Sequence, residues 1–396
     1  MQKAATPAFC TTIGGYTSVA QRSGYADLRT TEVLQNLKKN YHFFLNFAKP
    51  PLVSGNRKRD TIKSTYKLYK MKSKVLIIAI SFFFIQKATA QVNLYSEDIP
   101  RFFQAFDSLS TTKDTLKQIE FVKSLYIDKA SKGLKDFMRL RENNTIEMWK
   151  YAVSNKQNIT EKRPWMLSVM EQQAIIKKKV KKFKKIYPDF REGDVYFCVG
   201  RNNSGGTIFD KTVYIGTEVL ATDKDNWAVF LALHEFTHTQ QWTQRNILRL
   251  QSDTTFLNDY KRTHTQLLGQ CLEEGMADFV AELVNGEDLA KTNPFGHTAF
   301  GLKNEQAVWN EFKKEIFLPF DYSMGWLYAK REINGEKISD LGYFVGHQIC
   351  KSYYNKSKNK KQALKEMLAL NLKDDNSKKF LIASGYLTAK EIEQLK

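Results

Sequence analysis

Residues 226–242, with the sequence NWAVFLALHEFTHTQQW, decide how the rest of the chain is interpreted. They contain two histidines, His234 and His238, which are four positions apart and would therefore lie one turn apart on the same face of a helix. Both imidazoles could then reach one metal ion. Glu235 would lie about 100° further round the helix, where a carboxylate can accept a proton from a metal-bound water. We expect a helix with a metal site in its middle.

A simpler interpretation treats the histidines as a surface pair, because the five-residue HExxH pattern also arises by chance. The neighbouring positions argue against it, since they are apolar and indicate a helix that packs into the protein. These neighbours are Val229, Phe230, Leu231 and Leu233. Burying two imidazoles and a carboxylate there without a purpose would be costly. The metal-site interpretation is therefore favoured.

A candidate third ligand lies 36 residues after His238, in the segment EEGMAD at residues 273–278. Glu274 and Asp278 are four positions apart and would share one helix face. We predict that Glu274 is the third ligand and that Asp278 accepts a hydrogen bond from the second nitrogen of a ligand histidine. The small residues Gly275 and Ala277 would let this helix approach the HExxH helix closely.

Two alternatives to this third ligand stay open. Glutamates at the start of a helix stabilise its dipole without any metal, although the preceding HExxH motif favours the ligand interpretation. Glu273 is the main rival to Glu274, and His264 is a weaker one.

The remaining sequence predicts an α+β fold, mostly helical, with a small mixed sheet and no alternating βαβ units. Apolar residues recur at helical spacing over residues 96–186 and in much of 300–396. Residues 194–200 and 211–216 are rich in β-forming residues, and the Asn, Ser and Gly residues of RNNSGGTIFD between them predict a turn. A loop is expected over 251–265, and Asn285-Gly286 predicts the end of a helix.

The N-terminal part predicts an exported protein. Residues 71–74 are basic, residues 75–85 are apolar, and Ala88-Thr89-Ala90 supplies small residues at a cleavage site, so 71–90 is expected to be a signal peptide. The apolar run is shorter than the roughly 20 residues of a membrane-spanning helix. We expect residues 1–70 to be an upstream extension that is not part of the native protein. A secreted or periplasmic location without stable membrane insertion follows, with a buried helix or an uncleaved anchor as alternatives.

The formal net charge of +19 is unevenly distributed. Residues 1–90 contribute +12, which leaves +7 for residues 91–396, an ordinary surface charge. No nucleic-acid partner is therefore expected. The lysine-rich stretch IIKKKVKKFKKIYPDF could bind a membrane surface or nucleic acid, but a solvated helix face against a core is the favoured interpretation.

The motifs also resemble a known family. HEFTH followed by EGMAD resembles the gluzincin metallopeptidases, in which a glutamate and an aspartate four residues later complete a zinc site. More narrowly, VYFCVGRNNSGGT, HEFTHTQQ and EGMADFVAEL resemble a bacterial domain family described as zinc-dependent proteases of unknown function. This resemblance covers roughly residues 190–350. Together with the helical periodicity before and after it, it predicts a helical region at 91–187 and a zincin-like domain with a helical C-terminal part at 188–396. Gln241 and Gln244 stand where a metzincin has glycine and histidine, so that subclass is not indicated.

The resemblance implies zinc-dependent hydrolysis of a peptide or protein substrate, with Glu235 as the general base. DVYFCVG or KTVYIG would be the edge strand beside the HExxH helix, able to pair with an extended peptide. Tyr343 and His347 are candidate donors to the oxyanion of the reaction, and His297 is a weaker one. The alternative function is a catalytically degenerate, protease-like binding module of the cell envelope. A zinc hydrolase with a non-peptide substrate and a basic interaction protein are further alternatives.

Overall fold

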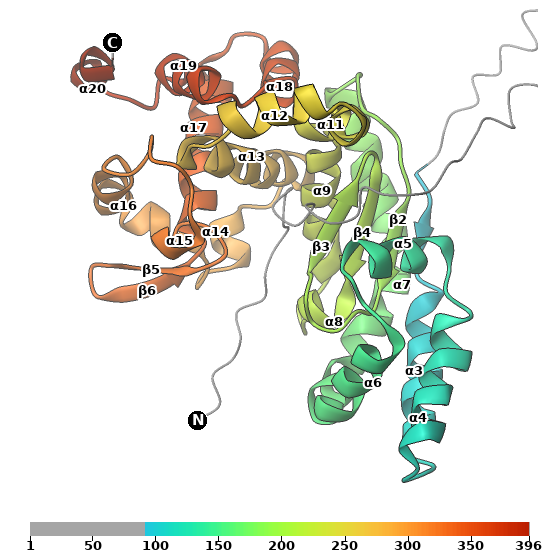
Figure 1. Ribbon diagram of the computed structural model, residues 1–396. Helices are drawn as coiled ribbons and strands as arrows, with labels where there is room; N and C mark the ends of the chain where they lie inside the picture. The colour runs from blue at the N-terminus through green and yellow to red at the C-terminus, as the bar shows by residue number, and fades with distance from the viewer. Residues whose placement is uncertain (1–91, 396) are drawn as a thin grey trace, which may run out of the picture. The chain divides into compact units, whose positions relative to one another are not determined.

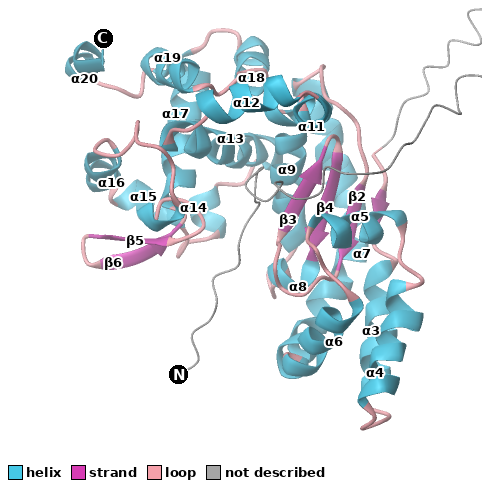
Figure 2. Ribbon diagram, in the orientation of Figure 1, coloured by secondary structure: helices cyan, strands magenta, loops and turns pink. Residues whose placement is uncertain are grey.

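The computed structural model describes residues 92–395, and Figure 1 shows their arrangement. The expected extension at 1–70 and the expected signal peptide at 71–90 lie outside these residues. Helices dominate the described part, and strands form two small sheets (Figure 2). The predicted α+β class is therefore confirmed.

The first part of the described chain is helical, as its periodicity predicts. Its elements are α3 (Asp98–Leu109), α4 (Thr115–Val122), a π-helical segment η1 (Lys123–Ile127), α5 (Lys132–Leu140), α6 (Thr145–Ser154) and the long α7 (Lys156–Ile186). Asp114, Ser131 and Asn144 each cap one of these helices, because their side-chain oxygens accept hydrogen bonds from first-turn N–H groups.

The larger sheet is mixed and has the strand order β1-β2-β4-β3. Its strands are β1 (Leu94–Tyr95), β2 (Val195–Cys198), β3 (Gly206–Phe209) and β4 (Thr212–Gly216). β1, β2 and β4 run parallel to one another, and β3 pairs with β4 in the antiparallel sense.

The edge strand beside the HExxH helix differs from the prediction. β2 and β4 are both internal to the sheet, and the edge strand is β3, which lies inside the segment predicted to be a turn. The turn residues are real, but they flank the strand: Asn202 and Asp210 both have positive φ, on either side of four extended residues. So short a strand between two turns leaves almost no period-2 pattern to recognise.

The central helices follow the sheet. They are α8 (Thr217–Leu220), α9 (Trp227–Gln240), α10 (Trp242–Arg245), α11 (Ile247–Ser252), α12 (Thr254–Thr263) and α13 (Leu267–Asn285). α9 carries the HExxH motif and packs against β3, β4, α7 and α13. The predicted loop at 251–265 is mostly α12, which Asp253 caps at its N-terminus. Gly286, with φ of 78°, ends α13 as predicted.

The C-terminal part is helical apart from one hairpin that the sequence interpretation missed. Its elements are α14 (Leu289–Thr292), α15 (His297–Lys303), α16 (Glu305–Phe312), the 3₁₀ turn η2 (Tyr322–Met324), strands β5 (Lys330–Ile333) and β6 (Glu336–Ser339), then α17 (Leu341–Lys356), α18 (Lys360–Leu368), α19 (Asp374–Ser384) and α20 (Ala389–Leu395). The antiparallel pair β5–β6 forms the second sheet.

α13 packs closely against α9, as predicted, but Gly275 lies on the side of α13 that faces α17. A Cβ atom on Gly275 would lie 2.2 Å from the backbone nitrogen of His347 and 2.5 Å from Cα of Gly346. A Cβ atom on Gly346 would lie 1.8 Å from the carbonyl oxygen of Cys271. Glycine at 275 and 346 is therefore what lets the two backbones touch.

Buried apolar side chains form one continuous core from β1 and α3 to α19. Residues 92–395 thus carry a hydrophobic core of their own. Within these residues, no helix is both long enough and apolar enough to span a bilayer.

Candidate metal centre

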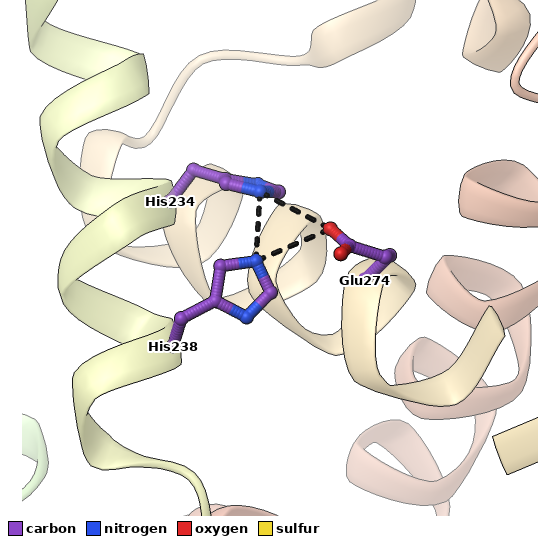
Figure 3. A group of neighbouring side chains, drawn as sticks. All are labelled: His234, His238 and Glu274. Atoms are coloured by element: carbon purple, nitrogen blue, oxygen red, sulfur yellow. Dashed lines mark hydrogen bonds and ion pairs between the residues drawn. The ribbon is translucent and has the colours of Figure 1, made fainter. Parts of the chain in front are cut away.

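Three buried side chains from two helices converge on one another (Figure 3). His234 and His238 project from α9, and Glu274 projects from α13. The two Nε2 atoms are 3.1 Å apart, and Glu274 Oε2 lies 3.5 Å from Nε2 of His234 and 3.2 Å from Nε2 of His238. All three side chains are buried, with no more than 4% of any residue exposed. The predicted metal ligands are therefore brought together.

The second nitrogen of each histidine has its own hydrogen-bond partner. His234 Nδ1 lies 2.8 Å from Asp278 Oδ1, as predicted, and His238 Nδ1 lies 2.7 Å from Gln241 Oε1. Since both partners are acceptors, each Nδ1 donates a hydrogen bond, and Nε2 is the nitrogen of each ring that remains available to a metal. Gln241 is itself fixed, because its amide nitrogen donates to the carbonyl oxygen of Glu273 at 2.7 Å.

Glu274 is held by a tyrosine that precedes the β5–β6 hairpin. The hydroxyl of Tyr328 donates to Glu274 Oε1 at 2.7 Å, which leaves Oε2 facing the histidines. Tyr328 and Asp340 stand at the two ends of the hairpin, and both have positive φ, 58° and 64°. The Tyr328 N–H donates to Asp340 Oδ1 at 2.7 Å, and the Asp340 N–H donates to the carbonyl oxygen of Ala329 at 3.1 Å. These two hydrogen bonds join the ends of the hairpin and hold both residues in a backbone conformation that is unfavourable for non-glycine residues.

Charge and burial are balanced against each other in the cluster. Burial alone would lower the pKa of His234, but the carboxylates of Asp278 and Glu274 outweigh it and raise that pKa well above its ordinary value. Glu274 likewise raises the pKa of His238 against the effect of burial. Burial would raise the pKa values of Glu274 and Asp278, yet the imidazoles beside them lower both. The two carboxylates therefore favour positive charge on the histidines beside them.

The distances suit a zinc ion. Zinc bonds of about 2.0–2.2 Å to nitrogen and oxygen place the corners of a tetrahedron about 3.3 Å apart. The three separations between ligand atoms, 3.1, 3.2 and 3.5 Å, bracket that value. Three protein ligands would leave one corner of the tetrahedron open.

Glu235 lies beside the cluster, about 100° further round α9, on the side of this helix that faces β3. It is 2% exposed, and burial raises the pKa of its carboxyl group. A Cβ atom on Gly206 would lie 1.9 Å from Glu235 Oε1, so only glycine fits at this position of the edge strand. Arg141 donates to the carbonyl oxygen of Gly206 at 3.0 Å and to Thr207 Oγ1, and its charge also acts on Glu235.

The other predicted site residues divide into two groups. The ring of Tyr343 stacks on that of His234, with centroids 6.1 Å apart. The ring of His297, the weaker candidate, lies 5.5 Å from Tyr343, and its Nε2 contacts Asp278 Oδ2 at 3.2 Å. His347 lies elsewhere: its Nε2 is 3.5 Å from Glu282 Oε2, two helical turns along α13 from Glu274.

The rival ligands also lie elsewhere. The side chain of Glu273 bonds to Thr243, and burial raises its pKa to about 7. His264 stacks on Tyr260, with ring centroids 4.0 Å apart, and its Nε2 contacts Asn371 Oδ1 at 2.6 Å. Of the three candidates for the third ligand, Glu274 is therefore the one that lies beside both histidines.

Sequence reasoning missed Tyr328, Gln241 and Arg141. Gln241 follows His238 by three positions, a spacing that could have suggested contact on a helix, although α9 ends just before it. Tyr328 and Arg141 lie 54 residues after Glu274 and 94 residues before Glu235, and no local pattern marks either as a neighbour of the cluster.

Comparison with known proteins gives one family. The family described as gliding motility protein GldB matches residues 84–388, well over half of the chain. No curated protein and no solved structure matches the chain. A gliding motility family of this lipoprotein type indicates an envelope location.

This match overturns the expected enzyme. The resemblance to gluzincin metallopeptidases, and with it the prediction of a zinc metallopeptidase or other hydrolase, is wrong, because the matched family is one of gliding motility proteins. The physical reason lies in the motif. HExxH followed by a glutamate places three ligands around a metal, and that arrangement serves a metal-holding module as well as a protease.

Proposed function

The chain belongs to the GldB family of gliding motility proteins, and from this premise we propose that it is a cell-envelope binding module built around a zinc ion. The ligands in this proposal are His234, His238 and Glu274. The expected alternative of a protease-like module of the envelope fits the family better than hydrolysis does.

The observation that carries the proposal is the orientation of the ligand atoms. Both Nδ1 atoms are engaged by acceptors, and Glu274 Oε1 is engaged by Tyr328. The remaining ligand atoms, two Nε2 and one Oε2, face one point and lie within 4.8 Å of one another. Two imidazoles and one carboxylate suit zinc, whereas calcium and magnesium prefer oxygen ligands alone.

In this proposal the ion joins α9 to α13, because its ligands come from both helices. These helices belong to the buried core, so a metal there would fix the arrangement of the sheet relative to the C-terminal helices. We further propose a periplasmic or secreted location. The signal-peptide pattern at residues 71–90 supports this finer assignment.

The test is the metal content of purified residues 91–396 after reconstitution with zinc and removal of excess metal. We expect about one zinc per chain in the parent and a loss of most of it in Glu274→Ala, which removes one of three ligands. Glu235→Gln is the matched control, because it changes the neighbour of His234 without touching a ligand, and it should retain zinc. A parent that binds no zinc, or a Glu274→Ala variant that binds it as tightly, would overturn the proposal.

A further inference from the structure

The C-terminal half of α7 carries a dense run of positive charge. Between residues 177 and 185 there are seven lysines and no acidic residue. The sequence alone cannot separate lysines that stabilise the fold from lysines that serve another purpose, but their contacts in the structure can.

Three of the seven lysines have structural contacts. Lys179 and Lys182 donate to the carbonyl oxygens of Asn285 and Leu283, at 2.5 and 3.1 Å. These carbonyls end α13, where a positive charge interacts favourably with the helix dipole. Lys184 pairs with Glu192. Lys179 and Lys182 therefore stabilise the contact with α13, and Lys184 forms an ion pair on another side of α7.

The other four lysines share one face. At 100° per residue, Lys177, Lys178, Lys181 and Lys185 lie within a sector of about 100° around α7. Lys178, Lys181 and Lys185 are exposed, and Lys177 is partly exposed. Within residues 92–395, none of the four has an ion pair with a carboxylate.

Two exposed residues without charge extend the same sector towards the N-terminus. Met170, which is 46% exposed, and Ala174 precede the lysines on this face, whereas Glu171 falls just outside the sector. We define the basic stripe as Met170, Ala174, Lys177, Lys178, Lys181 and Lys185. It spans 15 residue steps on one helix, a length of about 22 Å.

We propose that the basic stripe docks the protein on the surface of a bilayer that contains anionic phospholipids. Charge complementarity supports this partner, since the stripe offers positive charge without acidic residues between the lysines. A straight row on one helix face matches a plane, and an exposed methionine beside the lysines can enter the interfacial region. The envelope location indicated by the family brings such surfaces within reach.

Single-stranded nucleic acid is the polyanion that fits less well. Its binding sites combine positive charge with aromatic side chains on which bases stack. The stripe has no aromatic residue.

The expected strength of docking follows from the four charges. Each lysine near an anionic surface strengthens binding by roughly fivefold at moderate ionic strength, so four together contribute on the order of several hundredfold. The attraction falls within a Debye length of about 10 Å at 0.1 M salt. Docking should therefore weaken strongly as salt is raised.

The test uses residues 91–396, which carry their own core and lack the apolar run at 75–85. Binding is measured by co-sedimentation with vesicles of phosphatidylcholine, with or without phosphatidylglycerol. The test variant combines Lys177→Gln, Lys178→Gln, Lys181→Gln and Lys185→Gln. The control variant combines Lys150→Gln, Lys358→Gln, Lys361→Gln and Lys390→Gln, four exposed lysines elsewhere, and has the same net charge.

We expect the parent and the control to bind the phosphatidylglycerol vesicles, and the test variant to bind them more than about 100-fold more weakly. None of the three should bind phosphatidylcholine alone. The proposal fails if the parent does not bind anionic vesicles, or if the test variant and the control lose binding equally. Tighter binding of the parent to a single-stranded oligonucleotide than to the vesicles would also overturn it. Far-UV circular dichroism of both variants excludes loss of helix as the cause.

Discussion

Glu218 is a buried carboxyl group that forms no ion pair among residues 92–395. It is 1% exposed, its Oε1 accepts a hydrogen bond from the Asn202 N–H at 3.2 Å, and its Oε2 has no hydrogen-bond partner among residues 92–395. Burial raises the pKa of this carboxyl group from 4.5 to about 7. Between pH 4.5 and about 7, the carboxyl group is therefore protonated in the folded protein and mostly ionised in the unfolded chain.

This pKa makes stability depend on pH. Between pH 4.5 and about 7 the folded state binds more protons at Glu218 than the unfolded state does, so the free energy of unfolding falls as pH rises. Glu218→Gln is neutral at every pH and should escape that loss. We expect its free energy of unfolding, relative to the parent, to rise by about 3 kcal/mol from pH 4.5 to pH 8, as measured by urea denaturation.

The matched control for this prediction is Glu120→Gln, on an exposed turn of α4. It removes one carboxylate from the surface and should leave the difference from the parent nearly constant over the same pH range. A Glu218→Gln difference that is equally flat would show that the carboxyl group titrates near 4.5 in the folded protein.

At the scale of single residues, the sequence predicts part of the cluster of candidate metal ligands. The spacing of four positions between His234 and His238, and again between Glu274 and Asp278, decides which atoms meet, because a helix places such residues on one face. Tyr328 could not be found in this way. Its contact with Glu274 depends on the position of a hairpin that is distant in the sequence, and the spacing of residues along the chain does not predict that position.

Among the elements, the β5–β6 hairpin has the clearest link to the site. The hydrogen bond from the Tyr328 N–H to Asp340 positions Tyr328 at the start of the hairpin. The Tyr328 hydroxyl then donates to Oε1 of Glu274, so that Oε2 faces the histidines. Tyr328→Phe removes that hydroxyl while keeping the ring. Because the hydrogen-bond partners of metal ligands typically contribute 10–100-fold to affinity, we expect zinc to bind about tenfold more weakly, still with one site per chain. A competition titration against a chromophoric chelator measures this.

Tyr322→Phe serves as the control, since Tyr322 lies in the neighbouring 3₁₀ turn and is 49% exposed. Its zinc affinity should equal that of the parent. If Tyr328→Phe also matches the parent, Glu274 does not need the hydroxyl to be positioned. If the parent binds no zinc, the proposed metal centre itself fails, so the two outcomes are separable.

The elements also show where pattern reasoning stops. The long helices α7, α9 and α13 were predictable, because each repeats its apolar spacing over several turns. β3 has four residues between two turns, and the β5–β6 hairpin has an exposed, charged sequence with no alternating apolar face. Such elements form because neighbouring parts of the chain pair with them, which their own residues do not reveal.

Across the whole molecule, the metal cluster lies where the sheet side of the fold meets the C-terminal helices. α9 packs against β3 and β4, whereas α13 packs against α17 and α19. In the proposed function, an ion with ligands on both helices would resist separation of the two sides, and metal binding would then be coupled to global stability. Two contacts from the C-terminal part of the chain also hold α13 in place. They are the hydrogen bond from Tyr328 to Glu274 and the packing of α17 against Gly275.

Zinc should accordingly raise the melting temperature of residues 91–396. A ligand that binds only the folded state at 100 times its dissociation constant adds about 2.7 kcal/mol of stability. For a domain of this size that shift amounts to several degrees, on the order of 5 °C. Differential scanning calorimetry with zinc, and again with excess chelator, measures it. Glu274→Ala should lose most of the zinc-dependent shift, whereas Asp375→Ala, an exposed carboxylate on α19, should keep it. An equal shift in both variants would mean that zinc acts at surface carboxylates, and the cluster joining α9 to α13 would then have no part in holding the fold together.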